Sequence, residues 1–114
     1  MIAFLSVALF TTVSATTIAD AETARVAYSN CLVDFTTAQL DAKTGTSAFK
    51  KAAKDACAAE RKAMISAMEK DEMAFGSSAS EATSFATEEA DGVLFSFTDS
   101  YAGYASSSTR PVKQ

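Results

Sequence analysis

Apolar side chains recur with a helical period in the first charged segment of the chain, residues 20–42. The steps between them are four, three, four and three residues, and the stripe comprises Ala24, Tyr28, Cys31, Phe35 and Ala38, with Leu32 beside it. Residues three and four apart share one face of an α-helix. The segment therefore predicts a helix over residues 20–42, whose buried face holds an aromatic ring on either side of a cysteine.

A second periodic segment covers residues 48–75. It follows the interruption KTGTS, where we expect Gly45 to supply a left-handed helix end and Thr46 or Ser47 to cap the next helix. The expected inward face is traced by Phe49, Ala53, Ala56, Glu60, Ala63 and Ala67, and is widened by Cys57, Met64 and Met68. Because many of these residues are alanines, we expect this helix to approach its neighbours closely.

A third helix is predicted over residues 79–104. Ser78 and Glu81 have the spacing of a capping box, in which two side chains satisfy free N–H groups at a helix start. The run VLFSF at 93–97 could instead form a short strand, because it is β-branched and aromatic and follows Gly92; we expect a helix. Leu94, Phe95 and Phe97 cannot share one helical face, so at least one of them is exposed or meets a partner.

The fold class follows from this pattern and from the scarcity of helix breakers. The chain has four glycines, one proline and abundant alanine, which favours helices over a turn-rich β fold. We predict one all-α domain, residues 16–105, of three helices. Segments 20–42 and 48–75 form an antiparallel hairpin and the third helix packs across it. Residues 106–114 have no periodicity and are expected to be disordered.

The N-terminal residues resemble an export signal. Residues 2–10 are almost wholly apolar, no charge precedes Asp20, and Val13-Ser14-Ala15 suits a signal peptidase. We expect a signal peptide over residues 1–15, with cleavage after Ala21 as the alternative. A buried or membrane-spanning helix is the competing interpretation, but a span needs about 20 apolar residues and threonines interrupt this run. The prediction is a periplasmic or secreted protein with no stable membrane span after cleavage.

The two cysteines are placed symmetrically about the predicted hairpin loop. Cys31 and Cys57 each lie thirteen residues from Thr44, so antiparallel helices would bring them to the same height. Disulfides persist in oxidising compartments outside the cytosol, and a ring of this size stabilises a fold by about 3 to 3.5 kcal/mol. We therefore predict a Cys31–Cys57 disulfide.

Other cysteine chemistry does not fit the spacing. The separation of 26 residues is unlike a C-x-x-C redox motif. A zinc site usually takes four Cys or His ligands, and a catalytic cysteine is usually activated by a histidine, which the chain lacks. We expect no metal and no cofactor.

Composition and charge narrow the function further. The net charge is −4 and there is no histidine, so the commonest acid–base catalyst and metal ligand is absent. An acidic chain is a poor ligand for phosphate backbones, and we expect no nucleic-acid binding. Charge is unevenly spread, with a net +4 over residues 43–62 and −7 over 69–99. A weak attraction between a basic and an acidic helix, or two faces for charged partners, would explain this distribution.

Two short motifs carry a resemblance. Tyr28-x-x-Cys31-Leu32 and Ala56-Cys57-x-x-Glu60-Arg61 resemble a pattern in small exported helical proteins of proteobacteria that carry one cysteine on each of two helices. The resemblance covers residues 21–65. It implies an exported helical protein with a disulfide, and it implies no activity.

The expected function is non-enzymatic: a cell-envelope protein that binds another protein. The first alternative is a periplasmic carrier of a small apolar ligand or lipid, and the second is a small hydrolase that uses the carboxylate clusters at 69–72 and 88–91. The candidate apolar contacts to a ligand or partner are Tyr28, Phe35, Met64, Met68, Phe85, Phe95 and Phe97.

Overall fold

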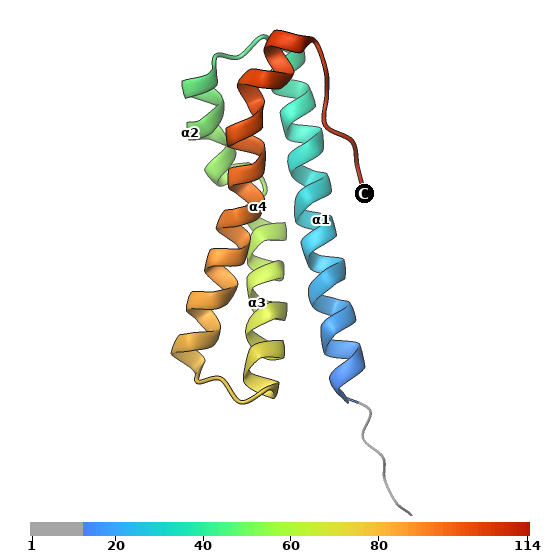
Figure 1. Cartoon of the computed structure of the whole chain (residues 1–114), viewed down its shortest axis with the longest axis vertical. Coiled ribbons are helices and arrows are strands. Elements are labelled where there is room, and N and C mark those ends of the chain that lie inside the picture. Colours follow the sequence, from blue (N-terminus) through green and yellow to red (C-terminus); the bar gives the residue numbers. More distant parts are fainter. Residues whose placement is uncertain (1–12) are drawn as a thin grey trace, which may run out of the picture.

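The computed structural model describes residues 13–114, with side chains from residue 20 onward, and this part of the chain is all-α. Its helices are α1 (Val13–Asp41), α2 (Thr46–Ala56), α3 (Ala58–Ala74) and α4 (Ala79–Ser107). α1 runs the length of the bundle, α2 and α3 return in series, and α4 runs back beside them (Figure 1). The predicted fold class is confirmed, and residues 93–97 are helical rather than a strand.

The expected signal peptide falls mostly on residues 1–12, which lie outside the described residues. Both expected cleavage positions, Ala15 and Ala21, fall within α1. None of the helices described here has the length and apolar character needed to cross a membrane.

The predicted helix over residues 48–75 is wrong in one respect, because it is two helices that meet at Cys57. Cys57 has φ −124° and ψ 46°, outside the helical region, and it serves as the C-cap of α2 and the N-cap of α3. Both helices contact α1 and α4, but in a different balance: α2 packs mainly against α4, whereas the most extensive contact of α3 is with α1. The flanking residues, Ala56 and Ala58, are good helix formers, so the local sequence gives no sign of the break.

The end of α1 corrects a second expectation. The left-handed residue is Lys43, with φ 56°, and not Gly45. The Thr44 N–H donates to the Gln39 carbonyl at 3.0 Å and the Lys43 N–H to the Leu40 carbonyl at 3.1 Å, which is the Schellman pattern. Gly45 has φ −65° and is the N-cap of α2, without a side-chain cap. Thr46 and Ser47 therefore lie inside α2 and do not cap it.

The connection from α3 to α4 follows the sequence more closely. Gly76, with φ 102°, ends α3 in the same Schellman pattern, since the Ser77 N–H donates to the Glu72 carbonyl at 3.1 Å. The hydroxyl of Ser78 then accepts a hydrogen bond from the Glu81 N–H at 3.2 Å. Ser78 is thus the N-cap of α4, as the sequence predicts.

The core changes character along α4. In the half of the bundle that contains α3, the buried residues of α4 are Ala82, Ala86 and Ala90; in the half that contains α2, they are Phe97 and Tyr101. We call these the alanine half (α3, residues 20–30 of α1 and 79–92 of α4) and the aromatic half (α2, residues 31–45 and 93–107). The central core joins them, and comprises Tyr28, Leu32, Val33, Phe49, Ala53, Cys57, Met64, Ala90, Phe97 and Tyr101.

The C-terminal segment differs from the expectation of a disordered tail over 106–114. Residues 106 and 107 belong to α4, and residues 109–114 run back along α1 (Figure 1). Arg110 forms an ion pair with Asp41, Lys113 pairs with Asp34 at 2.9 Å, and the Gln114 N–H donates to the side chain of Asn30 at 2.9 Å. Exposed ion pairs of this kind contribute about 0–1 kcal/mol each. These contacts join residues far apart in the sequence, which a local pattern does not reveal.

Candidate functional site

Cys31 of α1 and Cys57 at the α2–α3 break form a disulfide with a Cα–Cα distance of 6.1 Å. The predicted pairing is confirmed, although the second predicted helix is broken at one of its cysteines. Symmetry about Thr44 requires only that α2 return alongside α1, so the cysteine pairing does not depend on the direction that the chain takes after Cys57. Cys57 is buried, at 2% exposed, and Cys31 is partly exposed.

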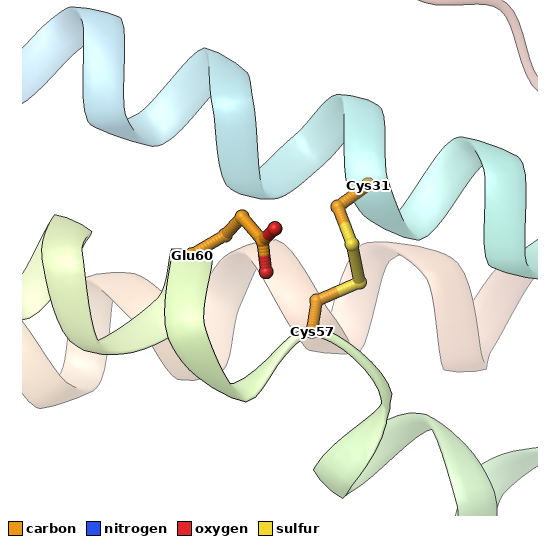
Figure 2. Close-up of side chains that lie close together, drawn as sticks. All are labelled: Cys31, Cys57 and Glu60. Carbon is orange, nitrogen blue, oxygen red and sulfur yellow. A yellow bond between two sulfur atoms is a disulfide. The ribbon is translucent and has the colours of Figure 1, made fainter.

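Glu60 lies beside this bond, as Figure 2 shows. It stands three residues after Cys57 in the first turn of α3, and its carboxylate oxygen and the two sulfur atoms lie within 4.8 Å of one another. Two thiolates and a carboxylate are donor types that zinc accepts. While the sulfurs are bonded to each other, they do not offer thiolates. Sequence reasoning placed Glu60 on the apolar face of a helix but did not connect it to the cysteines; the signal that could have done so is the spacing Cys57-x-x-Glu60.

Stacked aromatic rings fix the position of α2 next to the disulfide. The ring of Phe49 lies 3.9 Å from that of Tyr101 and 5.7 Å from that of Phe35, measured between centroids, and both pairs are stacked. The Tyr101 hydroxyl donates a hydrogen bond of 2.6 Å to the Thr44 carbonyl, and burial raises the pKa of Tyr101. One residue of α4 therefore contacts both α2 and the loop that precedes it.

Arg61 fixes the start of α3 against α4. Its guanidinium donates to the Asp91 carboxylate at 2.5 Å. Burial alone would lower the pKa of Arg61, but the Tyr28 hydroxyl and the Asp91 carboxylate together raise it. The Tyr28 hydroxyl and the second terminal nitrogen of Arg61 are buried without a hydrogen bond of standard geometry, so Asp91 is the partner that orients the guanidinium. This ion pair joins the basic 43–62 segment to the acidic 69–99 segment.

A groove opens between α2 and α4 on the surface of the aromatic half. It has a volume of about 480 Å³ and is lined by Lys50, Lys54, Asp91, Leu94, Phe95, Thr98 and Asp99. Phe95 is 64% exposed, whereas Phe97 is buried and Leu94 is packed partly against the core. The expectation that these three residues cannot share one face is confirmed, and Phe95 is the exposed one.

The seven candidate apolar contacts are dispersed in the structure. Tyr28, Met64 and Phe97 are buried in the central core. Phe35 and Met68 pack against that core and are partly buried. Phe85 and Phe95 are exposed on α4. Of the seven, Phe95 is the residue that lines the groove.

Comparison with known proteins gives no relative from which a function could be transferred. No family model, no curated protein and no solved structure matches this chain. Function must therefore be inferred from the chain's own residues.

Proposed function

We propose that this chain is a small exported protein without enzymatic activity that binds another protein in the cell envelope through the groove between α2 and α4. The observation that carries the proposal is Phe95, a large aromatic side chain 64% exposed in a groove of about 480 Å³ beside Leu94. Aromatic residues surrounded by a polar rim supply much of the affinity of protein interfaces. An exposed ring in a hollow of this kind supports an interaction site.

The charges around the groove indicate the kind of partner. Lys50 and Lys54 line its α2 side and Asp99 its α4 side. Among the described residues, the ion pairs include Arg61 with Asp91 but none that involves Lys50, Lys54 or Asp99. A protein segment with an apolar side chain for Phe95, an acidic group facing α2 and a basic group facing Asp99 complements this surface. Such charges mainly set orientation and the rate of association.

The disulfide and the N-terminal sequence support the location. A disulfide that joins the core residue Cys57 to the partly buried Cys31 is stable in an oxidising compartment, and disulfides are rare in the cytosol. The apolar run at residues 2–10 has the character of an export signal. Together they favour a periplasmic or secreted protein.

The test compares two exposed phenylalanines, Phe95 in the groove and Phe75 at the C-terminal end of α3. Tagged wild-type protein, Phe95→Ala and Phe75→Ala are used to capture partners from the native organism, and the affinity for the purified partner is then measured. Phe75 is 66% exposed at the end of α3 and is the matched control. We expect Phe95→Ala to weaken binding by about tenfold or more, as truncation of an interface anchor does, while Phe75→Ala binds normally. Equal binding by both variants would overturn the assignment of the groove.

The carrier function remains the second candidate, because the groove volume lies within the range of about 300–1,000 Å³ that is typical of small-molecule sites. Native mass spectrometry of protein purified from its own organism distinguishes the two. A lipid or apolar molecule that is retained by Phe75→Ala and lost from Phe95→Ala would favour the carrier.

A further inference from the structure

We propose that the dithiol form of this protein binds a zinc ion through the Sγ atoms of Cys31 and Cys57 and the carboxylate of Glu60. This site is distinct from the α2–α4 groove, and it does not rest on the proposed function. It uses the same sulfur atoms as the disulfide, so the metal and the disulfide are alternative states of one pair of cysteines.

The donor set and its geometry suit zinc. Zinc binds thiolates at about 2.3 Å and carboxylates at about 2.0–2.2 Å in a tetrahedral arrangement. One oxygen of Glu60 and the two sulfurs already lie within 4.8 Å of one another (Figure 2), so small side-chain rotations bring all three to one ion. Three protein ligands leave the fourth position to water, as in zinc sites that remain open to exchange.

The surrounding packing holds these residues together when the disulfide is reduced. On the α2 side of Cys57, the stacking of Phe49 on Tyr101 fixes the helix. On the α3 side, the ion pair between Arg61 and Asp91 fixes the first turn. Leu32, the neighbour of Cys31, is fully buried in the core. None of these contacts involves a sulfur atom, so the thiols remain adjacent after reduction.

The position of Cys57 favours the charged ligand that zinc requires. Cys57 is the N-cap of α3 and Glu60 lies in its first turn. The N-terminus of a helix carries partial positive charge and unpaired N–H groups, and this environment stabilises a thiolate. Cys57 and Glu60 therefore both lie at the N-terminal end of α3, where negative charge is stabilised.

A phosphine reductant converts the disulfide form into the dithiol form. A phosphine reductant attacks one sulfur, the S–S bond breaks and, with one water, the products are two thiols and the phosphine oxide. Zinc then displaces the two thiol protons as it binds. In the reverse direction a small-molecule disulfide accepts two electrons from the two thiolates by thiol–disulfide exchange and leaves as two thiolates, the Cys31–Cys57 bond forms again and the ion is released.

Cobalt(II), a spectroscopic substitute for zinc, tests the site. The protein is reduced with a phosphine under anaerobic conditions and titrated with cobalt, and zinc is then added in competition. We expect a thiolate-to-cobalt charge-transfer band at one metal per chain, its loss on addition of zinc, and no band with oxidised protein. The absence of the band in reduced wild-type protein would overturn the proposal.

Matched variants establish the ligands. Glu60→Gln should weaken metal binding by about tenfold or more, since even outer-shell changes at metal sites have effects of this size. Glu69→Gln, farther along α3, should bind as wild type does. Equal affinity of the two variants would remove Glu60 from the site. If reduction unfolds the protein, zinc should restore its helical circular dichroism in wild type and not in Glu60→Gln; a failure to restore it in wild type would likewise overturn the site.

Discussion

The two halves of the bundle pack their helices in different ways. In the alanine half, α4 presents Ala82, Ala86 and Ala90, all fully buried, and small side chains allow close approach at the expense of buried area per residue. In the aromatic half, α4 presents Phe97 and Tyr101, and α2 adds Phe49 together with the disulfide. One helix, α4, therefore serves two packing modes, one based on the close fit of small side chains and the other on a few large contacts.

The difference predicts where each half is vulnerable. A few rings and one covalent bond carry the aromatic half, so removal of any of them should be costly. In the alanine half, the buried side chains of α4 are all small, so no single substitution on α4 removes a large contact. The stability of this half should instead be sensitive to substitutions that add volume.

The largest expected effect is the loss of a central ring from the aromatic half. Phe49→Ala removes a fully buried side chain that stacks on both Phe35 and Tyr101, and should lower the free energy of unfolding by about 3–5 kcal/mol. Phe75→Ala, at an exposed position at the end of the alanine half, should change it by less than about 0.5 kcal/mol. Urea denaturation of both variants measures the contrast, and similar losses would contradict the division into halves.

Removal of the disulfide should destabilise the protein by a comparable but smaller amount. The double substitution Cys31→Ala and Cys57→Ala opens a ring spanning 26 residues, which costs about 3.5 kcal/mol in the chain-entropy model. Hydrogen exchange should show a larger loss of protection in α2 than in the α3–α4 hairpin, because α2 lies within the ring. Uniform loss of protection would show that the two halves unfold as one unit.

Added volume tests the alanine half. Ala86→Leu places a large side chain where α4 is fully buried and should cost about 1–3 kcal/mol through overpacking. Ala102→Leu, at an exposed position of the same helix, controls for helix propensity and should be nearly neutral. Chemical denaturation is the measurement. A neutral Ala86→Leu would mean that the alanine half is loosely packed.

The smallest expected effects concern the two Schellman ends. Lys43 ends α1 and Gly76 ends α3, both with positive φ. A residue with a Cβ atom is strained in this conformation and glycine is not, so Lys43 is strained whereas Gly76 is relaxed. Lys43→Gly should therefore stabilise the protein by about 0.5 kcal/mol and Gly76→Ala should destabilise it by about 1 kcal/mol. Thermal unfolding of the two variants shows whether each is more or less stable than the wild-type protein. A loss of stability in Lys43→Gly would contradict this account of the end of α1.

The sequence predicted the helical content and the disulfide because both depend on local spacing. The period of Tyr28, Cys31 and Phe35 follows from the helix repeat alone, and the equal distances of the two cysteines from Thr44 lead to a pairing once α2 returns alongside α1. The capping residue Ser78 was identified for the same reason, since its hydrogen bond to Glu81 is local.

The features that sequence reasoning missed depend on contacts between distant segments. The break at Cys57 separates two helices that divide their contacts differently between α1 and α4, and Ala56 and Ala58 beside it carry no helix-breaking signal. The C-terminal segment is placed by ion pairs of Arg110 and Lys113 with α1, which no periodicity indicates. Glu60 had the right spacing from Cys57, but its proximity to Cys31 required the position of α1.

The disulfide also changes what the connecting loops must do. Residues 42–45, between α1 and α2, lie inside the covalent ring that Cys31 and Cys57 close, whereas residues 75–78, between α3 and α4, lie outside it. A protease cut within 42–45 would leave the two fragments joined through sulfur, so the mass would change only by the water added in hydrolysis until the disulfide was reduced. A cut within 75–78 would leave α4 attached by noncovalent packing alone. At the end that holds the α1–α2 loop, the disulfide provides a second covalent connection between the helices. At the end that holds the α3–α4 loop, the backbone is the single covalent connection.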